Sequence, residues 1–241
     1  ALCAGQTIRH SWRCKTDAAR TADEYTAWLS PLFQRAKCDY DKVTGIIVSS
    51  VVPDANYNLR RMGIDCWGLE PLFAVRELID IDITLPRPDE VGADRLVNAM
   101  AAVQAYGAPA IIIDFGTATT FDIVNSAGAY CGGVIAPGIN LSIDALHRAA
   151  AKLPRIAIAK PPAVTGTDTV SAMQSGIFWG YTGLIEGLLK RLKEEMKETD
   201  ISVIATGGLA PLFTDAIPEI SKVDPELTLR GLIHIYHKRN N

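Results

Sequence analysis

The chain has 241 residues, enough for one large or two modest domains with a substantial core. Hydrophobic residues make up 48% of it and the formal net charge is −3, which fits a globular protein without a general attraction to nucleic acid. No apolar run reaches membrane-spanning length, and the five cysteines are scattered without a CxxC pair, so we expect a cytoplasmic protein with no membrane partner.

The start of the chain resembles its middle. Residues 1–14 read as a strand, a turn and a strand, and residues 122–135 repeat this pattern. We therefore predict an internal duplication, with an N-terminal half at residues 1–108 and a C-terminal half at residues 109–241. The second copy is preceded by one more strand and turn, so the duplication predicts roughly fifteen further residues before Ala1.

Strand and helix patterns alternate along both halves, which is typical of an α/β protein. We predict helices at residues 21–32, 54–62, 94–107, 140–151 and 170–198. We predict strands at residues 43–52, 71–75, 79–85, 111–114, 121–124, 129–135, 156–159 and 201–205.

A glycine-containing loop at residues 92–95, Gly-Ala-Asp-Arg, leads into the predicted helix at residues 94–107. Asp94 stands where an N-cap belongs, and such a cap stabilises a helix by about 1 kcal/mol. A carboxylate beside Arg95 could also hold a small polar substrate and take a proton from its hydroxyl. The position alone favours the cap, and both roles stay open.

The predicted strand at residues 111–114 ends in a polar turn, Asp-Phe-Gly-Thr-Ala-Thr-Thr. Gly116 lets a ligand approach the main chain, and Thr117 and Thr119 add hydroxyls and amides around the turn. This composition suits a phosphate, with Asp114 placed to order a cation or a water against it. An ordinary hairpin with strand-favouring threonines is the alternative.

Two further glycine patterns stand out. Gly207 and Gly208 follow the predicted strand at residues 201–205, where a turn could approach a flat ligand or a phosphate, although such turns are common. The long predicted helix carries glycines at spacings of three or four residues. Because glycine weakens a helix, they indicate close packing, either at a dimer interface or inside one subunit. These glycines are Gly176, Gly180, Gly183 and Gly187.

Taken together, six stretches resemble the type III pantothenate kinases in order and spacing. They are residues 90–98, 114–122, 132–138, 151–155, 169–176 and 205–209. The resemblance implies a duplicated ribonuclease H-like fold of the actin-like ATPase kind, with two similar α/β domains and the active site in the cleft between them. It implies a kinase that uses ATP to phosphorylate pantothenate, the first step of coenzyme A biosynthesis.

The resemblance also implies roles for individual residues. Asp94 would accept the proton of the pantothenate hydroxyl, and Asp114 would bind a monovalent cation, potassium or ammonium. The pantothenate site would consist of Gly92, Ala93, Asp94, Arg95 and Thr169. The ATP site would consist of Gly116, Thr117, Thr119, Gly207 and Gly208. The cofactors would be ATP with Mg²⁺, and the family's members are homodimers joined partly through the long helix.

The sequence departs from the family pattern at two places. The family begins with an Asp-x-Gly-Asn-Thr phosphate turn, and this chain starts after it, without that half of the phosphate clamp. Leu85 stands where many members have a tyrosine, which puts one pantothenate contact in doubt.

Two other functions stay open at this point. The chain could be an actin-like kinase for another small hydroxy substrate, which would need a different loop at residues 92–95. It could also be a binding or accessory regulatory protein with a vestigial site. The retention of Asp94, Asp114 and Thr117 and the acidic net charge count against that role.

Overall fold

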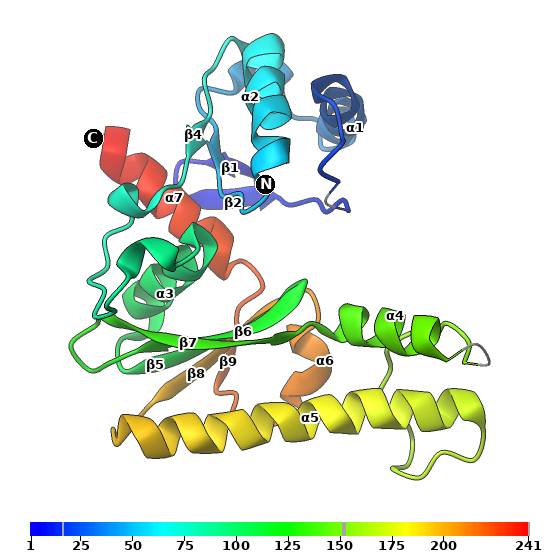
Figure 1. The fold of residues 1–241 in the computed structure, drawn as a ribbon. Coiled ribbons are helices and arrows are strands. Elements are labelled where there is room, and N and C mark those ends of the chain that lie inside the picture. Colours follow the sequence, from blue (N-terminus) through cyan, green and yellow to red (C-terminus); the bar gives the residue numbers. More distant parts are fainter. Residues whose placement is uncertain (16, 151–152, 241) are drawn as a thin grey trace. The chain divides into compact units, whose positions relative to one another are not determined.

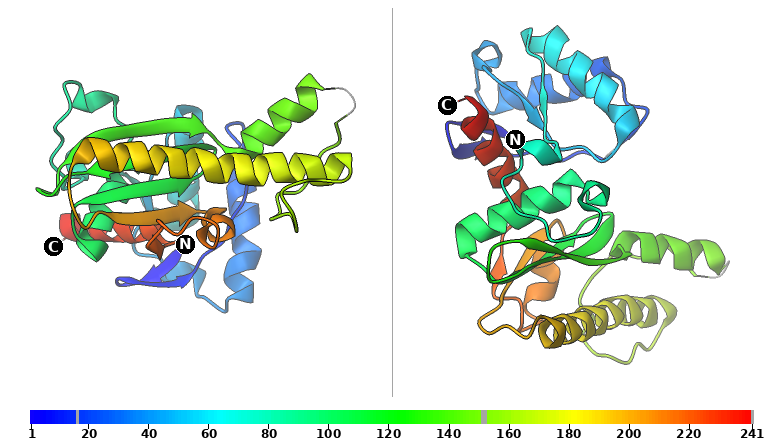
Figure 2. Two further views of the ribbon diagram at one scale, coloured as in Figure 1. Left: turned by 90° about the horizontal axis from the view of Figure 1, so that it is seen from below. Right: turned by 60° about the vertical axis from the view of Figure 1, so that its left-hand side comes forward.

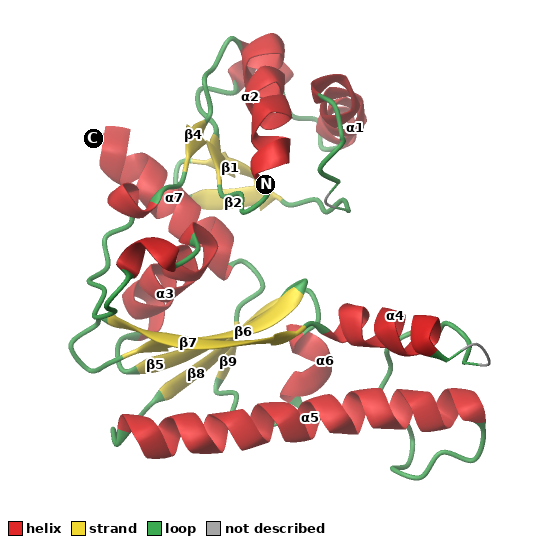
Figure 3. Cartoon of the chain, viewed as in Figure 1, coloured by secondary structure: helices red, strands yellow, loops and turns green. Residues whose placement is uncertain are grey.

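The structure is a computed structural model that describes residues 1–15, 17–150 and 153–240. Its helices and strands alternate, which confirms the predicted α/β class (Figures 1 and 3). The residues form two compact units. Unit 1 comprises Ala1–Asp80, Asp89–Val97 and Thr228–Asn241, and unit 2 comprises Ile81–Pro88 and Asn98–Leu227. The predicted boundary between residues 108 and 109, drawn for a sequence duplication, stays a prediction.

Unit 2 is built on a five-stranded sheet in the order β7-β6-β5-β8-β9. Its strands are β5 (Ala110–Phe115), β6 (Ala118–Val124), β7 (Tyr130–Pro137), β8 (Ser202–Gly207) and β9 (Lys222–Val223). Strand β6 runs antiparallel to both neighbours, whereas β5 pairs in parallel with β8, and β8 with β9. This order and these directions are those of a ribonuclease H-like sheet, as predicted for each half.

Helix α5 (Thr169–Met196) lies along one face of this sheet in all views (Figures 1 and 2). The part of α3 (Ala93–Tyr106) that belongs to unit 2 lies on the opposite face. Helices α4 (Ile139–Ala149) and α6 (Ala210–Thr214) complete the α5 side. The three isoleucines of β5, residues 111–113, are fully buried in the apolar core. This burial confirms the predicted buried strand.

An aromatic stack ties the end of β5 to the helices. The ring of Phe115 is parallel to that of Phe213, with centroids 5.5 Å apart, and Phe213 stacks on Phe178 of α5 at 5.1 Å. All three side chains are buried. The last residue of β5 is therefore held by core packing, which fixes the start of the turn that follows it.

Unit 1 contains two small sheets. Strands β1 (Leu2–Ala4) and β2 (Thr7–His10) form an antiparallel hairpin, and β3 (Ile47–Val48) pairs in parallel with β4 (Leu72–Phe73). The helices of this unit are α1 (Ala22–Arg35), α2 (Pro53–Trp67) and most of α7 (Leu227–Asn240). Short 3₁₀ turns lie at Tyr40–Lys42, Arg76–Leu78 and Pro88–Glu90. A cavity of about 930 Å³ is lined by both sheets and by residues of all three helices.

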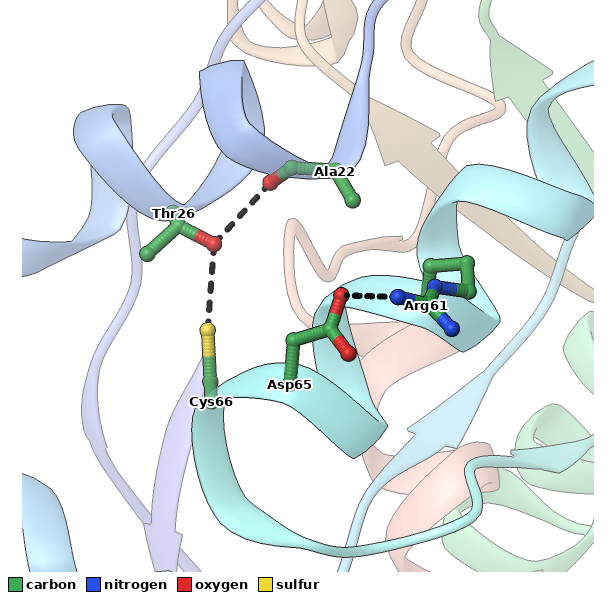
Figure 4. A network of polar contacts seen from close by, with 5 residues as sticks. All are labelled: Ala22, Thr26, Arg61, Asp65 and Cys66. Atoms are coloured by element: carbon green, nitrogen blue, oxygen red, sulfur yellow. Dashed lines mark hydrogen bonds and ion pairs between the residues drawn. The ribbon is translucent and has the colours of Figure 1, made fainter.

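Local signals explain how α1 and α2 form and meet. Thr21 caps α1 in a capping box with Glu24, as expected for a helix start. The Thr26 hydroxyl of α1 donates to the Ala22 carbonyl at 2.9 Å and lies 3.0 Å from the Cys66 sulfur of α2 (Figure 4). Because the hydroxyl proton is already used, the Cys66 thiol is the natural donor of the second contact.

Four predicted strands are wrong or too long, and one of them, residues 71–75, pairs only at Leu72–Phe73. Residues 79–85 pair only through a single bridge between Ile83 and Tyr130, because Pro86 and the acidic residues 80 and 82 interrupt an apolar strand pattern. Residues 156–159 form no strand, although Ile156 and Ile158 pack against the core. Only Ile47–Val48 pairs within residues 43–52. The helix predicted at residues 140–151 is α4, Ile139–Ala149. Residue 151, the last residue of that prediction, lies outside the described residues, and so do residues 151 and 152 of the motif at 151–155.

Three of the four glycines of α5 are not packed against other described elements. A Cβ atom placed on Gly176, Gly180 or Gly183 would have no described atom within 4 Å, other than its own neighbours on the helix. All three residues are exposed. Tight packing inside one subunit, one of the two explanations considered above, is therefore wrong for these three positions.

Candidate active site

The turn that was predicted to hold phosphate lies between β5 and β6. The Gly116 amide donates to the Ala118 carbonyl at 3.0 Å, and the exposed residues Gly116 and Thr117 form the tip. Thr119 differs from them because it belongs to β6, is fully buried, and has a hydroxyl without a hydrogen-bond partner among the described residues. The turn thus exposes Gly116 and Thr117 but not the Thr119 side chain.

The start of α4 packs closely against this turn. A Cβ atom on Gly138, the residue before α4, would collide with the Thr117 carbonyl. Gly138 also provides no side chain to cap the helix, so amides of the first turn of α4 have no side-chain acceptor there. Glycine is needed here because the two backbones approach each other directly.

Asp114 lies at the end of β5 and is held from two sides. The side-chain amide of Asn98, on α3, donates to Asp114 Oδ2 at 3.0 Å, and Asn98 is only 2% exposed. On the other side, β8 pairs with β5 so that Asp114 faces Thr206 and Phe115 faces Gly207. The parallel register therefore brings Gly207, predicted from sequence as part of the ATP site, beside the predicted cation ligand.

Gly207 has a backbone φ of +91°, which side chains rarely adopt. A Cβ atom there would lie 2.8 Å from Asp114 Oδ1 and 2.6 Å from the Phe115 carbonyl oxygen. Only glycine fits without a shift of the neighbouring strand. The Thr-Gly-Gly turn is therefore more than an ordinary strand end: it is shaped to the carboxylate and backbone at the end of β5.

A pocket of about 450 Å³ opens next to the turn within unit 2. One wall consists of Phe115, Gly116, Thr117, Gly208 and Leu209, and the other of Asn140, Leu141 and Asp144 from α4. Sequence reasoning missed the α4 residues. The sequence signal for them is a helix that starts directly after Gly138 and carries the apolar Leu141 among polar residues. The structure shows that Leu141 is exposed. Asp144 is 3.7 Å from Arg155, and this exposed ion pair contributes little to stability.

The predicted substrate loop lies in unit 1, where α3 begins at Ala93. The Gly92 carbonyl accepts hydrogen bonds from the amides of Arg95 and Leu96, so Gly92 precedes the helix and Asp94 lies within its first turn. The predicted N-cap role of Asp94 is therefore wrong. Its Oδ1 instead accepts from the Arg95 amide at 2.9 Å, and the side chain is half-buried.

Gly92 is matched to the Asp94 side chain. A Cβ atom on Gly92 would lie 2.5 Å from Asp94 Oδ1, so a larger residue would displace the carboxylate. The Arg95 amide and the space at Gly92 together hold one oxygen of Asp94 in place. The loop is thus built to orient a carboxylate at a helix start.

Thr169 is the first residue of α5 and is exposed. The preceding Asp168 caps the helix, since its Oδ1 accepts from the amides of Val170 at 2.9 Å and Ser171 at 3.0 Å. The hydrogen bonds from Ser171 hold the pKa of Asp168 below its usual value. This cap fixes the backbone at the start of α5 and therefore the position from which the Thr169 side chain extends.

The described part of the chain holds no group of three or more histidine, cysteine, aspartate or glutamate side chains that could bind a metal ion. A metal cage made by the protein alone is therefore absent from residues 1–15, 17–150 and 153–240. Magnesium is commonly held by one or two carboxylates together with substrate phosphates, so this arrangement fits a metal that arrives with a nucleotide.

A sequence model of type III pantothenate kinases matches residues 1–191. The chain belongs to the type III pantothenate kinase family. It is 54% identical to the type III pantothenate kinase of Paramagnetospirillum magneticum over 239 residues, 98% of this chain and 91% of that protein. It is 53% identical to that of Acidiphilium cryptum over 229 residues, 95% of this chain and 86% of that one.

The fold also resembles a solved structure. A Campylobacter jejuni protein described as a Baf family transcriptional activator aligns with a TM-score of 0.58 over 83% of this chain and 85% of that chain. The sequence identity is 20%, so this likeness shows the fold alone and carries no function. Within the described residues, no helix of this family member is long and apolar enough to cross a membrane.

Proposed function

We infer that the protein phosphorylates pantothenate with ATP, the first step of coenzyme A biosynthesis. The observation that carries this inference is the identity above 50% with type III pantothenate kinases over nearly the whole chain. The reaction moves the γ-phosphoryl group of ATP to the terminal hydroxyl of pantothenate and releases ADP. The proton of that hydroxyl must go to an acceptor.

We propose that Asp94 is this acceptor. Its carboxylate is half-buried, is oriented by the Arg95 amide, and is not used to cap α3. A modest base suffices, because the alcohol loses its proton late in a loose transition state. Arg95 would pair with the pantothenate carboxylate, and the backbone at Gly92 and Ala93 would contact the substrate.

Thr169 would contribute a hydroxyl to pantothenate. This proposal is supported by the exposed position of Thr169 at the capped start of α5. Leu85, which stands in place of a common tyrosine, lies near Gly132: a Cβ atom there would be 3.4 Å from the Leu85 side chain. It could offer an apolar contact but no hydrogen bond to the substrate.

The turn between β5 and β6 would hold ATP phosphates through the Gly116 and Thr117 backbone and the Thr117 hydroxyl. Its exposed tip and the neighbouring pocket support this role. Gly207 and Gly208 would lie by the adenosine. Thr119, also predicted at this site, would support the turn from within β6, because its side chain is buried.

Members of this family use ATP with a divalent metal, which neutralises phosphate charge during transfer. The proposal assigns the Mg²⁺ ion to the nucleotide phosphates, in agreement with the lack of a protein-only cage among the described residues. Asp114 would bind potassium or ammonium beside the phosphate turn.

We further propose that the protein is a cytoplasmic homodimer that uses the glycine face of α5. Gly176, Gly180 and Gly183 are exposed, and a Cβ atom on any of them would have no described atom of another element within 4 Å. Glycine lowers helix stability, and in a monomer no contact of these residues would offset that loss. A second helix could approach closely along this face.

A substrate panel tests the proposed reaction. The protein is incubated with Mg-ATP and either pantothenate, a sugar or another hydroxy acid, and ³¹P NMR identifies the phosphorylated product. We expect a phosphate monoester of pantothenate and no comparable product from the other substrates. Faster phosphorylation of another hydroxy compound would make this chain a kinase of different specificity. No phosphorylation of any compound would favour a binding protein.

A further inference from the structure

Val51 is an exposed apolar residue beside the predicted substrate loop, and the roles proposed above give it no part. It lies in unit 1 between β3 and α2 and is 60% exposed. Single exposed apolar side chains are common on protein surfaces, so exposure alone assigns no function to it. Its surroundings are more informative, because Val51 Cγ1 lies 3.9 Å from the point that a Cβ atom on Gly92 would occupy.

Asp94, the proposed proton acceptor, borders the same point. Its Oδ1 lies 2.5 Å from the Cβ position on Gly92. The Val51 methyl group and the Asp94 carboxylate are therefore on the same side of the Gly92 backbone. All three residues belong to unit 1. A substrate hydroxyl that reaches Asp94 would thus bring the carbon atoms next to it close to Val51.

The backbone on the C-terminal side of Val51 is held by a tight turn. The Ser50 hydroxyl accepts from the Val52 amide at 3.2 Å and donates to the Val52 carbonyl at 3.3 Å. Pro53, the first residue of α2, further restricts the backbone of Val52. Because its neighbours fix the chain, Val51 can present its methyl groups to a ligand at little cost in ordering.

Pantothenate carries an apolar group where this arrangement can use one. Its terminal hydroxyl, which receives the phosphoryl group, is separated by one methylene from a carbon with two methyl groups. The rest of the molecule offers a second hydroxyl, an amide and a carboxylate. The two methyl groups are therefore the part of the substrate near Asp94 that suits an apolar side chain. A sugar would instead place hydroxyls against Val51, which would lose hydrogen bonds to water without a replacement.

We propose that Val51 is a specificity-determining residue that contacts the two methyl groups next to the phosphorylated hydroxyl of pantothenate. The proposal rests on the proposed function, since it names a further contact of the same substrate at Asp94. It divides the recognition of one end of the substrate between two residues. Asp94 accepts the proton of the hydroxyl, and Val51 selects a branched alcohol over an unbranched or polar one.

The test combines protein variants with a substrate variant. The substrate variant is a pantothenate analogue in which both methyl groups are replaced by hydrogen. Val51→Ala removes the side-chain methyl groups, whereas Val51→Thr keeps the shape and replaces one of them by a hydroxyl. Ile64→Ala is the control, because Ile64 is also an exposed aliphatic residue, at 39%, and lies near the opposite end of α2.

The first measurement is the preference for pantothenate, taken as the ratio of its kcat/KM to that of the analogue. One methylene more or less in an apolar site changes kcat/KM by about 10-fold or more. We therefore expect the preference to fall about 10-fold in Val51→Ala and by less in Val51→Thr, and to stay unchanged in Ile64→Ala. A general disturbance of the site would slow both substrates equally and leave the ratio unchanged. An unchanged ratio in the two Val51 variants would overturn the proposal.

The second measurement does not need turnover. Isothermal titration calorimetry compares the Kd values of pantothenate and the analogue for the natural protein and for Val51→Ala. The natural protein should bind pantothenate about 10-fold more tightly than the analogue, and Val51→Ala should bind the two almost equally. Equal affinities in the natural protein, or the same difference in both proteins, would count against the contact.

These readouts separate the two levels of inference. If the protein phosphorylates neither compound but binds pantothenate in preference to the analogue through Val51, the proposed reaction fails and the contact stands. If pantothenate is phosphorylated and the ratio does not depend on Val51, the reaction stands and the contact is overturned. If pantothenate is neither bound nor phosphorylated, both are overturned.

Discussion

The backbone of Gly207 lies directly against the carboxylate of Asp114. A Cβ atom on Gly207 would be 2.8 Å from Asp114 Oδ1, although 93 residues of sequence separate the two. Parallel pairing of β5 with β8 creates this proximity and joins the predicted ATP turn to the predicted cation ligand. Changes at either residue should therefore affect the same region.

Gly207→Ala should destabilise the protein by roughly 3 kcal/mol, because the residue must keep φ near +91° and its Cβ would overlap the Phe115 carbonyl. Urea denaturation measures the loss. Gly5→Ala is the control, since Gly5 also has a positive φ but open space around it. That substitution should cost only about 1 kcal/mol. Equal losses at the two positions would argue against close packing at Gly207.

Asp94→Asn should lower turnover by about 100-fold or more and leave the fold intact, because the amide cannot accept the substrate proton. The measurement is ADP release with saturating pantothenate, with circular dichroism as the check on folding. Asp89→Asn changes another carboxylate in the adjoining 3₁₀ turn, where Asp89 pairs with Arg76, and should retain turnover. Natural turnover in Asp94→Asn would exclude this residue as the base.

Asp144→Asn tests whether the α4 wall of the pocket contacts the nucleotide. If the carboxylate accepts a hydrogen bond from ATP, the KM for ATP should rise about 10-fold and the KM for pantothenate should stay unchanged. Asp215→Asn, an exposed carboxylate outside the pocket lining, is the control. A rise in both KM values, or in neither, would remove α4 from the ATP site.

Gly180→Leu tests the proposed dimer. Leucine is the better helix former by about 0.8 kcal/mol, so a monomer should become more stable. If the glycine face of α5 joins two subunits, the substitution should instead shift the protein towards monomers in sedimentation velocity. Glu219→Leu, at an exposed position outside α5, should leave the sedimentation profile unchanged. An unaltered profile in Gly180→Leu would place the dimer contact elsewhere or remove it.

Local patterns in the sequence predicted much of unit 2. The apolar run at residues 111–113 defined the central strand, and Gly116 marked the turn that follows it, because both signals act over a few neighbouring residues. The sequence could not predict that Gly207 would meet Asp114 or that Asn98 would bond to it. These contacts depend on strand register and helix packing, which single-sequence patterns do not encode.

The errors have physical causes as well. Asp94 satisfied the rule for an N-cap, but the helix already starts at Ala93 because Gly92 supplies the carbonyl that accepts from Arg95 and Leu96. Residues 156–159 are apolar enough for a strand but pair with no strand among the described residues, and Ile156 and Ile158 pack against the core without regular secondary structure. Thr119 is a different case: its place in the ATP site stays a prediction, although strand alternation buries its side chain.

The most direct test of the central claim is ADP release by the purified protein in potassium buffer with Mg-ATP, measured with and without pantothenate. The account predicts slow release without pantothenate and a large increase when it is added, together with loss of that increase in Asp94→Asn. Folded protein that binds ATP but releases ADP at the same rate with and without pantothenate would contradict it.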